Sequence, residues 1–348
     1  MKKNISLLLV ILLVVGVVSG CASGGTPKKS LYVYNWGDYI DESVIGEFEK
    51  EYGIKVVYET FATNEDMYVK IKQGGTKYDV AMPSDYMIEK MIKESLLEPI
   101  NIAKITTFGD IAPEFKNLPF DKGNQYSIPY LWGTVGIIYN KTMVTDPVDS
   151  WNILWNEKYK GQIVMLDSER DALAVSLKRL GYSLNSRDTK ELEEAKLSLI
   201  KQKPLLLAYA GDNLKDMMIS GEGSMAVCWS GDAMYMMGEN PDLAYALPKE
   251  GSNLWFDNMV IPKGAKNIEE AHLFIDFMNR AEIAKKNVEY IGYSTPNTKA
   301  KALLDPSVSG NLSAYPKIDQ LSNFEVFLDP GTFIENYNQI WIEVKSAK

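Results

Sequence analysis

The chain has 348 residues, with 46 acidic and 37 basic side chains and a formal net charge of −9 at pH 7. This acidic balance argues against a nucleic-acid partner and against binding to anionic lipid surfaces. Two Cys and one His offer no cluster that would hold zinc. The length favours two lobes, and the scarcity of Cys means that the hydrophobic core alone must stabilise them.

The N-terminal residues have the pattern of a lipoprotein signal peptide. Lys2 and Lys3 are followed by an apolar run over residues 7–18, which is shorter than the roughly 20 residues that span a bilayer. The sequence Val-Ser-Gly-Cys at 18–21 resembles the bacterial lipobox, in which the Cys thiol receives a lipid. We therefore expect residues 1–20 to be a lipoprotein signal peptide and Cys21 to carry the lipid. The alternative is an ordinary signal peptide with a Cys nearby.

Removal of residues 1–20 changes the net charge to −11, because they contain two Lys and no acid. Residues 21–29 are small and polar, which suits a flexible tether to the membrane. Once Cys21 is lipidated, Cys228 is the one remaining thiol, so no intramolecular disulfide is expected.

The first part of the mature chain alternates between strand and helix patterns. Strands are predicted at 31–36, 54–61 and 78–82. Three helices are predicted: one that follows Asp41, one that Asn64 caps, and one that begins at Asp85. Gly53 is expected to end the first helix and Gly74 the second. Such alternation predicts an α/β fold with a mainly parallel sheet covered on both faces.

The second part repeats this pattern. Strands are predicted at 135–140, 162–166, 224–229 and 254–261. Helices are predicted over residues 172–180, in a segment that ends near residue 219, from residue 232 onward, and over about residues 268–290. The sequence contains no repeat and no long linker, so short crossovers are expected to join the lobes.

Aromatic, hydroxyl and carboxylate side chains gather at four strand-to-helix junctions. Ligands of open α/β sheets bind outside the carboxyl ends of the strands, which is where these junctions lie. A further ring and carboxylate stand two residues apart on a predicted strand and therefore on the same side of it. The candidate residues are Trp36, Gly37, Asp38, Tyr39, Ser84, Asp85, Tyr86, Ser168, Asp171, Trp229, Trp255 and Asp257.

This combination of side chains suits an alkyl polyamine. Aromatic faces pack against methylene groups and attract ammonium groups, and each buried ammonium needs a carboxylate partner. Every residue also has a structural interpretation. Trp36 and Tyr39 could be core aromatics, Asp85 and Asp171 could be helix caps, and Asp257 could be solvated on a strand edge.

Five segments, 31–39, 78–86, 126–133, 254–257 and 291–297, resemble the bacterial spermidine/putrescine-binding protein family. The resemblance implies a two-lobe periplasmic-binding-protein fold with inter-lobe hinge crossovers. It implies a lobe 1 of residues 30–134 completed by 257–302, and a lobe 2 of residues 135–256 completed by 303–348. The ligand would lie in the cleft between them.

The resemblance also implies the residues that line this cleft, which are Trp36, Tyr39, Ser84, Tyr86, Trp229, Trp255, Asp257 and Tyr293. Three positions depart from the family pattern. Asp171 stands where the spermidine receptor has Glu, Ser168 where it has Asp, and Phe327 where it has a ligand-binding Gln. Asp38 and Asp85 are expected to compensate for the lost charge.

The implied function is the capture of spermidine, putrescine or both outside the cytoplasm and their delivery to the permease subunits of an ABC importer. The chain would act as a membrane-anchored monomer without a cofactor. A receptor that delivers its ligand to an importer needs no catalytic centre, and the sequence contains few residues that could form one.

An enzyme is the main alternative from another functional class. The single His, His272, lies in the helical pattern of residues 268–278, where a packing or capping role is expected. Without a second His or a G-x-S-x-G motif, Ser-His-Asp chemistry is disfavoured. The G-x-G-x-x-A match at 221–226 follows a helix and precedes a strand, the reverse of a dinucleotide site. A glycosidase-like pair of carboxylates and a sugar or amino-acid receptor stay open as alternatives.

Overall fold

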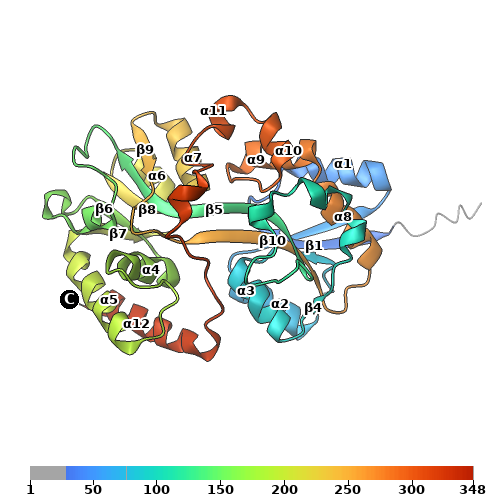
Figure 1. Ribbon diagram of the computed structural model, residues 1–348, viewed down its shortest axis with the longest axis horizontal. Helices are drawn as coiled ribbons and strands as arrows, with labels where there is room; N and C mark the ends of the chain where they lie inside the picture. Colours follow the sequence, from blue (N-terminus) through green and yellow to red (C-terminus); the bar gives the residue numbers. More distant parts are fainter. Residues whose placement is uncertain (1–28, 76, 348) are drawn as a thin grey trace, which may run out of the picture.

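A computed structural model describes residues 29–75 and 77–347. The predicted signal peptide and Cys21 lie outside these residues. Figure 1 shows two lobes side by side, joined in the middle by the long strands β5 (Ser127–Asn140) and β10 (Leu254–Pro262). The two-lobe α/β fold expected from the sequence is confirmed. None of the helices within the described residues is long and apolar enough to cross a membrane.

Lobe 1 is built on the strand order β2-β1-β3-β10-β5. Strands β1 (Ser30–Trp36), β2 (Lys55–Phe61) and β3 (Val80–Ala81) are parallel, whereas β10 runs antiparallel to β3 and β5 and also pairs with β4 (Leu97–Glu98). The helices of this lobe are α1 (Glu42–Tyr52), α2 (Asn64–Gln73), α3 (Asp85–Lys93), α8 (Ile268–Met278), α9 (Ala281–Ile291), α10 (Thr298–Leu303) and α11 (Pro306–Ser309).

Lobe 2 continues the same path through β5, β8, β6 and β7. The parallel members are β6 (Ile163–Leu166), β7 (Leu206–Ala210) and β8 (Met225–Trp229), while β9 (Leu243–Ala246) pairs antiparallel with β5. Its helices are α4 (Glu169–Arg179), α5 (Thr189–Gln202), α6 (Leu214–Ile219), α7 (Ser230–Glu239) and α12 (Ile334–Ser346). The expectation of a mainly parallel sheet is wrong, because the strands that connect the lobes run antiparallel to their neighbours.

Helix ends follow the expected local chemistry with one exception. Asp41 caps α1 by accepting from the Ser43 backbone N–H, and Gly53 ends this helix in the left-handed conformation that glycine adopts without strain. In α2, Thr63 rather than Asn64 is the N-cap. The side chain of Asn64 is thereby released for contacts elsewhere in the lobe.

Two separate hydrophobic cores lie on either side of the lobe boundary. Strand β5 passes from one core to the other, since Trp132 packs in the first and Val135 in the second. Tyr315 packs in the first core, although it falls within residues 303–348, which are expected to complete lobe 2. The chain crosses for the third time after this point, and α12 then packs in the second core.

Candidate ligand-binding site

Asp257 lies at the centre of the candidate site, on β10. Its Oδ2 accepts a hydrogen bond from the Tyr39 hydroxyl at 2.5 Å, and its Oδ1 accepts from the Ser84 hydroxyl at 2.6 Å. Only 6% of the residue is exposed, and burial raises the pKa of its carboxyl group to about 6. The two hydroxyls lower this pKa, because they stabilise the ionised form. Three predicted site residues therefore meet at this carboxylate.

Ser84 owes its position to the start of α3. It is the N-cap residue of that helix, although its side chain makes no capping hydrogen bond. Its hydroxyl instead donates to Asp257, and it accepts from the Asn64 amide at 3.1 Å. The Asn64 side-chain oxygen in turn accepts from the Ser84 backbone N–H. Asn64 therefore lies beside the candidate site, whereas the sequence predicts it only as a helix cap.

Asp85 has a structural role. One carboxylate oxygen accepts from the Tyr86 backbone N–H at 2.7 Å, and the other accepts from the Phe256 backbone N–H at 3.0 Å. The residue is buried, and burial raises the pKa of its carboxyl group well above the usual value. Asp85 thus ties α3 to β10. Since backbone groups occupy both oxygens, the structure gives no support to the expectation that Asp85 compensates for a missing ligand carboxylate.

Asp171 is a second buried carboxylate, on α4 of lobe 2. Its Oδ2 accepts from the Ser168 hydroxyl at 2.7 Å, whereas its Oδ1 is buried and has no hydrogen-bond partner. Burial raises the pKa of Asp171 to about 6. Ser168 is the N-cap of α4, so the capping role considered for Asp171 belongs to its neighbour. Asp171 is therefore free to meet a cation with one oxygen.

Neither of these carboxylates forms a salt bridge within the described residues, although the nearby charge of Arg170 partly offsets the effect of burial on the pKa of Asp171. No Lys or Arg among residues 29–75 and 77–347 forms an ion pair with Asp171 or Asp257. A carboxylate held away from water without a counter-ion is unfavourable, and its pKa rises until a cation is supplied. The two residues come from different lobes, so a ligand with positive charges at two places would satisfy both.

Aromatic rings stand beside these carboxylates. Trp255 and Tyr293 pack edge to face with their centroids 5.0 Å apart, and Tyr293 also packs against Tyr39. Two glycines allow this arrangement. A Cβ atom at Gly133 would lie 2.3 Å from the Trp255 ring, and one at Gly231 would lie 2.0 Å from the Tyr293 ring. Gly231 belongs to α7 of lobe 2, so its contact with Tyr293 joins the lobes.

Tyr86 makes a further contact between the lobes. Its ring packs against the small cluster of Ala174, Leu184 and Phe327 in lobe 2. The guanidinium group of Arg170 lies over the Phe327 ring, 4.4 Å from its centroid. Phe327 is buried and offers no side-chain hydrogen bond.

The remaining predicted residues lie at the ends of their strands. Trp36 is half-buried at the end of β1 and donates its ring N–H to the Met82 carbonyl oxygen at 2.9 Å. Trp229 is half-buried at the end of β8. Gly37 and Asp38 are exposed, and Asp38 has a positive φ of 48°. The structure brings neither of these two residues to the buried carboxylates.

Asn253 is a polar residue at the site that sequence analysis did not identify. It precedes β10, is 4% exposed, and its side-chain oxygen has no hydrogen-bond partner. Burial raises the pKa of Asp171, and the side-chain N–H group of Asn253 partly offsets this rise by hydrogen-bonding the carboxylate. The strand pattern contains one usable signal, since residue 253 falls on the same side of the strand as Trp255 and Asp257.

His272 has the structural role expected from the sequence. Its Nδ1 hydrogen-bonds the Ile268 carbonyl oxygen at 2.7 Å, and its Nε2 accepts from the Asn101 backbone N–H at 3.0 Å. Nδ1 is thus used within α8, and Nε2 joins α8 to the segment at Asn101. No nitrogen is left for proton transfer.

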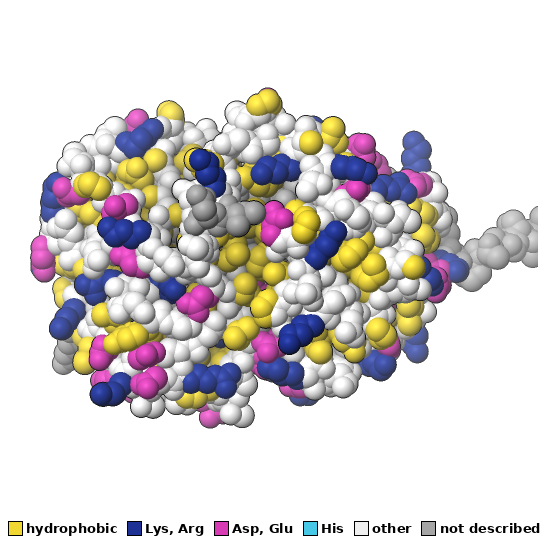
Figure 2. All heavy atoms as spheres, viewed as in Figure 1, with side chains coloured by type: hydrophobic (Ala, Val, Ile, Leu, Met, Phe, Trp, Pro, Cys, Tyr) yellow, Lys and Arg dark blue, Asp and Glu magenta, His cyan; other side chains and the backbone are white. Residues whose placement is uncertain are grey.

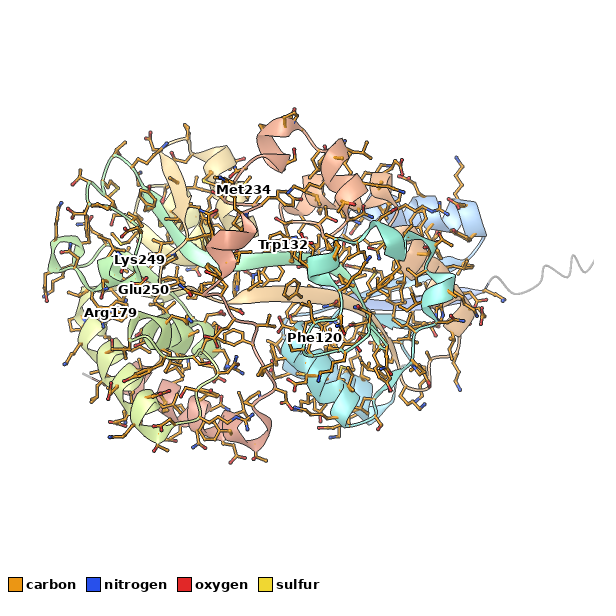
Figure 3. The ribbon with its side chains drawn as sticks, in the orientation of Figure 1. Phe120, Trp132, Arg179, Met234, Lys249 and Glu250 are labelled. Atoms are coloured by element: carbon orange, nitrogen blue, oxygen red, sulfur yellow. The ribbon has the colours of Figure 1, made fainter. Side chains whose placement is uncertain are left out.

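Figure 2 shows hydrophobic side chains gathered along the boundary between the lobes. A separate surface hollow of about 540 Å³ lies on lobe 2, between the end of α4 and residues 322–325. Figure 3 places Arg179, Lys249 and Glu250 together in this part of lobe 2, away from Phe120 and Trp132 in lobe 1. Glu250 accepts from Ser150 and from the Trp151 backbone, so its charge is already satisfied.

Comparisons with known proteins agree with this geometry. The family model described as bacterial extracellular solute-binding protein matches residues 43–319. A spermidine/putrescine-binding periplasmic protein of Escherichia coli K12 is 38% identical over 331 residues, covering 94% of each chain. A spermidine/putrescine-binding periplasmic protein of Haemophilus influenzae is 35% identical, covering 92% of this chain and 90% of the relative.

Two solved structures have the same fold. The spermidine/putrescine ABC transporter substrate-binding protein of Streptococcus pneumoniae is 46% identical with a TM-score of 0.85, covering 91% of this chain and 99% of the other. A putative spermidine/putrescine ABC transporter protein of Listeria monocytogenes is 48% identical with a TM-score of 0.86, covering 92% and 100%. The resemblance found in the sequence is confirmed, and the chain belongs to the spermidine/putrescine-binding family of bacterial extracellular solute-binding proteins.

Proposed function

We propose that this protein binds a polyamine, spermidine, putrescine or both, between its lobes and delivers it to an ABC importer. One observation carries the proposal: two buried carboxylates, Asp171 and Asp257, lie on opposite lobes and form no salt bridge with a Lys or Arg of the described residues. The curated relatives, which are named for these same ligands, support it.

In the proposed complex, Asp171 and Asp257 accept hydrogen bonds from ammonium groups. Trp255 and Tyr293 pack against the methylene chain and attract the charges through their ring faces. Trp36, Tyr39, Ser84, Tyr86, Trp229 and Phe327 complete the proposed set. Charge-assisted hydrogen bonds of this kind are stronger than neutral ones and offset the cost of removing the amines from water. Binding requires no chemical step, and we propose that the protein is not an enzyme.

We further propose that Cys21 carries a lipid that holds the protein, as a monomer, at the outer face of the cell membrane. The lipobox-like sequence at 18–21 and the small residues after it support this proposal. Metabolic labelling with a fatty-acid analogue should mark the wild-type protein but not Cys21→Ser. An unlabelled wild-type protein that is released into the medium would contradict the anchor.

Calorimetric titration of purified residues 22–348 tests the ligand. Spermidine, putrescine and spermine are compared with a sugar and with a neutral amino acid. Saturable binding of at least one polyamine is expected, together with a higher melting temperature, because a ligand that binds only the folded state stabilises it. Binding of the sugar or the amino acid alone would overturn the proposal.

A further inference from the structure

Asn253 is a buried residue whose side-chain oxygen has no hydrogen-bond partner within the described residues. It is 4% exposed, and its Oδ1 is among the few buried side-chain oxygens in the described residues that have no hydrogen bond. An amide oxygen removed from water without a donor is costly. The Oδ1 atom of Asp171 is likewise buried and has no hydrogen-bond partner within the described residues.

The backbone fixes where the Asn253 side chain lies. The backbone carbonyl oxygen of Asn253 accepts a hydrogen bond from the Val135 N–H at 3.1 Å, and Val135 belongs to β5, which joins the lobes. Asn253 also pairs in a parallel bridge with Glu325, on the third crossing of the chain. Asn253 is thus held between two of the three inter-lobe connections. These backbone contacts fix the position of its Cα atom between the two connections.

Residues 253, 255 and 257 form a row along one side of β10. Successive side chains of a strand alternate between its faces, and the bulge in this strand comes only after Asp257. The row consists of an amide, an indole ring and a carboxylate, all buried. At about 3.3 Å per residue its two ends are about 13 Å apart along the backbone. A single ammonium group therefore cannot contact both ends, and each end must serve a different amine.

We propose that the side-chain oxygen of Asn253 accepts a hydrogen bond from a terminal ammonium group that also contacts Asp171. This inference rests on the proposed function. An ammonium ion carries three N–H donors, and Asp171 offers it one free oxygen. Asn253 supplies a second acceptor without adding charge. It thereby serves the end of the ligand at which Ser168 supplies a hydroxyl rather than a carboxylate.

The test uses three variants and two readouts. Asn253→Leu keeps the size of the side chain but removes the acceptor, and Asn253→Asp keeps an acceptor and adds charge. Ser252→Ala is the matched control, because Ser252 is the adjacent buried residue and its side chain lies on the opposite side of the extended chain. Calorimetry gives the affinity for spermidine and putrescine at pH 7.5, and the melting temperature is measured without ligand.

Asn253→Leu should bind at least tenfold more weakly, while its unliganded melting temperature stays the same or rises, because a buried acceptor without a partner has been removed. A merely structural Asn would give the opposite sign, a lower melting temperature. Asn253→Asp should bind at least as tightly as the wild type, and Ser252→Ala should bind within twofold of it.

Wild-type affinity in Asn253→Leu, or a tenfold loss in Asn253→Asp, would overturn this inference and leave the proposed function standing. A wild-type protein that binds no polyamine would instead overturn the proposed function.

Discussion

The Lys93 ammonium group of α3 lies 3.1 Å from the Asp329 carboxylate and so joins lobe 1 to the last crossing segment. The backbone N–H of Asp329 also donates to Glu89 of the same helix at 2.8 Å. On the other side, Asp329 is held to lobe 2 by Arg187, which donates to its carbonyl oxygen. These contacts link α3 of lobe 1 to lobe 2 through Asp329, and we expect them to favour the closed form.

We predict that Lys93→Met speeds ligand release by about 1.4- to fivefold, since a partly exposed ion pair contributes about 0.2–1 kcal/mol. The association rate should change less. Stopped-flow tryptophan fluorescence measures both rates. Lys263→Met is the control, because Lys263 pairs with Glu98 at 2.9 Å within lobe 1 and has a similar exposure. Equal effects of the two variants on release would contradict a role in closure.

We predict that Asp257→Asn weakens polyamine binding by more than tenfold and does not lower the unliganded melting temperature. The amide can still hydrogen-bond the hydroxyls of Tyr39 and Ser84, but it brings no negative charge to the ligand. Calorimetry and thermal unfolding check the two parts. An unfolded Asp257→Asn protein would show that the residue is structural.

Affinity should fall as the pH is lowered through 6. The pKa values of Asp171 and Asp257 are both raised by burial to about 6, and a cationic ligand binds their ionised forms. At pH 5 each group is about one-tenth ionised, so affinity should be on the order of 100-fold lower than at pH 7.5 if both must ionise. Titrations across this range give the slope, and a flat profile would exclude both groups as ligand contacts.

The unliganded protein should respond to pH in the opposite direction. A carboxyl group whose pKa is raised in the folded state keeps its proton where the unfolded chain has lost it, so its contribution to stability falls between about pH 4 and 6 as the pH rises. Asp171→Asn should therefore melt above the wild type at pH 7, with a smaller difference at pH 5. A constant difference would argue against a buried, ionised Asp171.

Gly231→Ala should hold the lobes apart. The added Cβ atom would meet the Tyr293 ring at 2.0 Å, and separation of the lobes relieves this clash. We expect a more than tenfold loss of affinity with little change in the unliganded melting temperature. Gly238→Ala, in the same helix with open space around it, should bind normally. Similar affinities for the two variants would contradict the role given to this contact.

Local signals in the sequence predicted much of the fold, because they act within a few residues. Asp41 and Gly53 lie at the two ends of α1 as expected, and Asp85–Lys93 is helical as expected. The first half of β5 was missed because Pro129 is unfavourable inside a strand. In the structure Pro129 pairs with Asn258 beside the bulge of β10, where a missing N–H is tolerated.

The surroundings of a candidate residue can be predicted where residue type alone indicates chemistry, but not where they depend on a distant partner. Asp257 belongs to the first case. Asp85 belongs to the second, since its carboxylate is occupied by a backbone N–H that is 171 residues away in sequence. Asn253 is similar, because its free oxygen becomes evident only once two other parts of the chain are placed around it.

The three crossings between the lobes also determine when the protein can fold during its synthesis. The core of lobe 1 lacks Tyr315, and that of lobe 2 lacks Tyr337 and Val344, until nearly the whole chain has been made. A ribosome-bound fragment that ends before α12 therefore cannot complete both lobes. This topology places the completion of both hydrophobic cores at the end of synthesis.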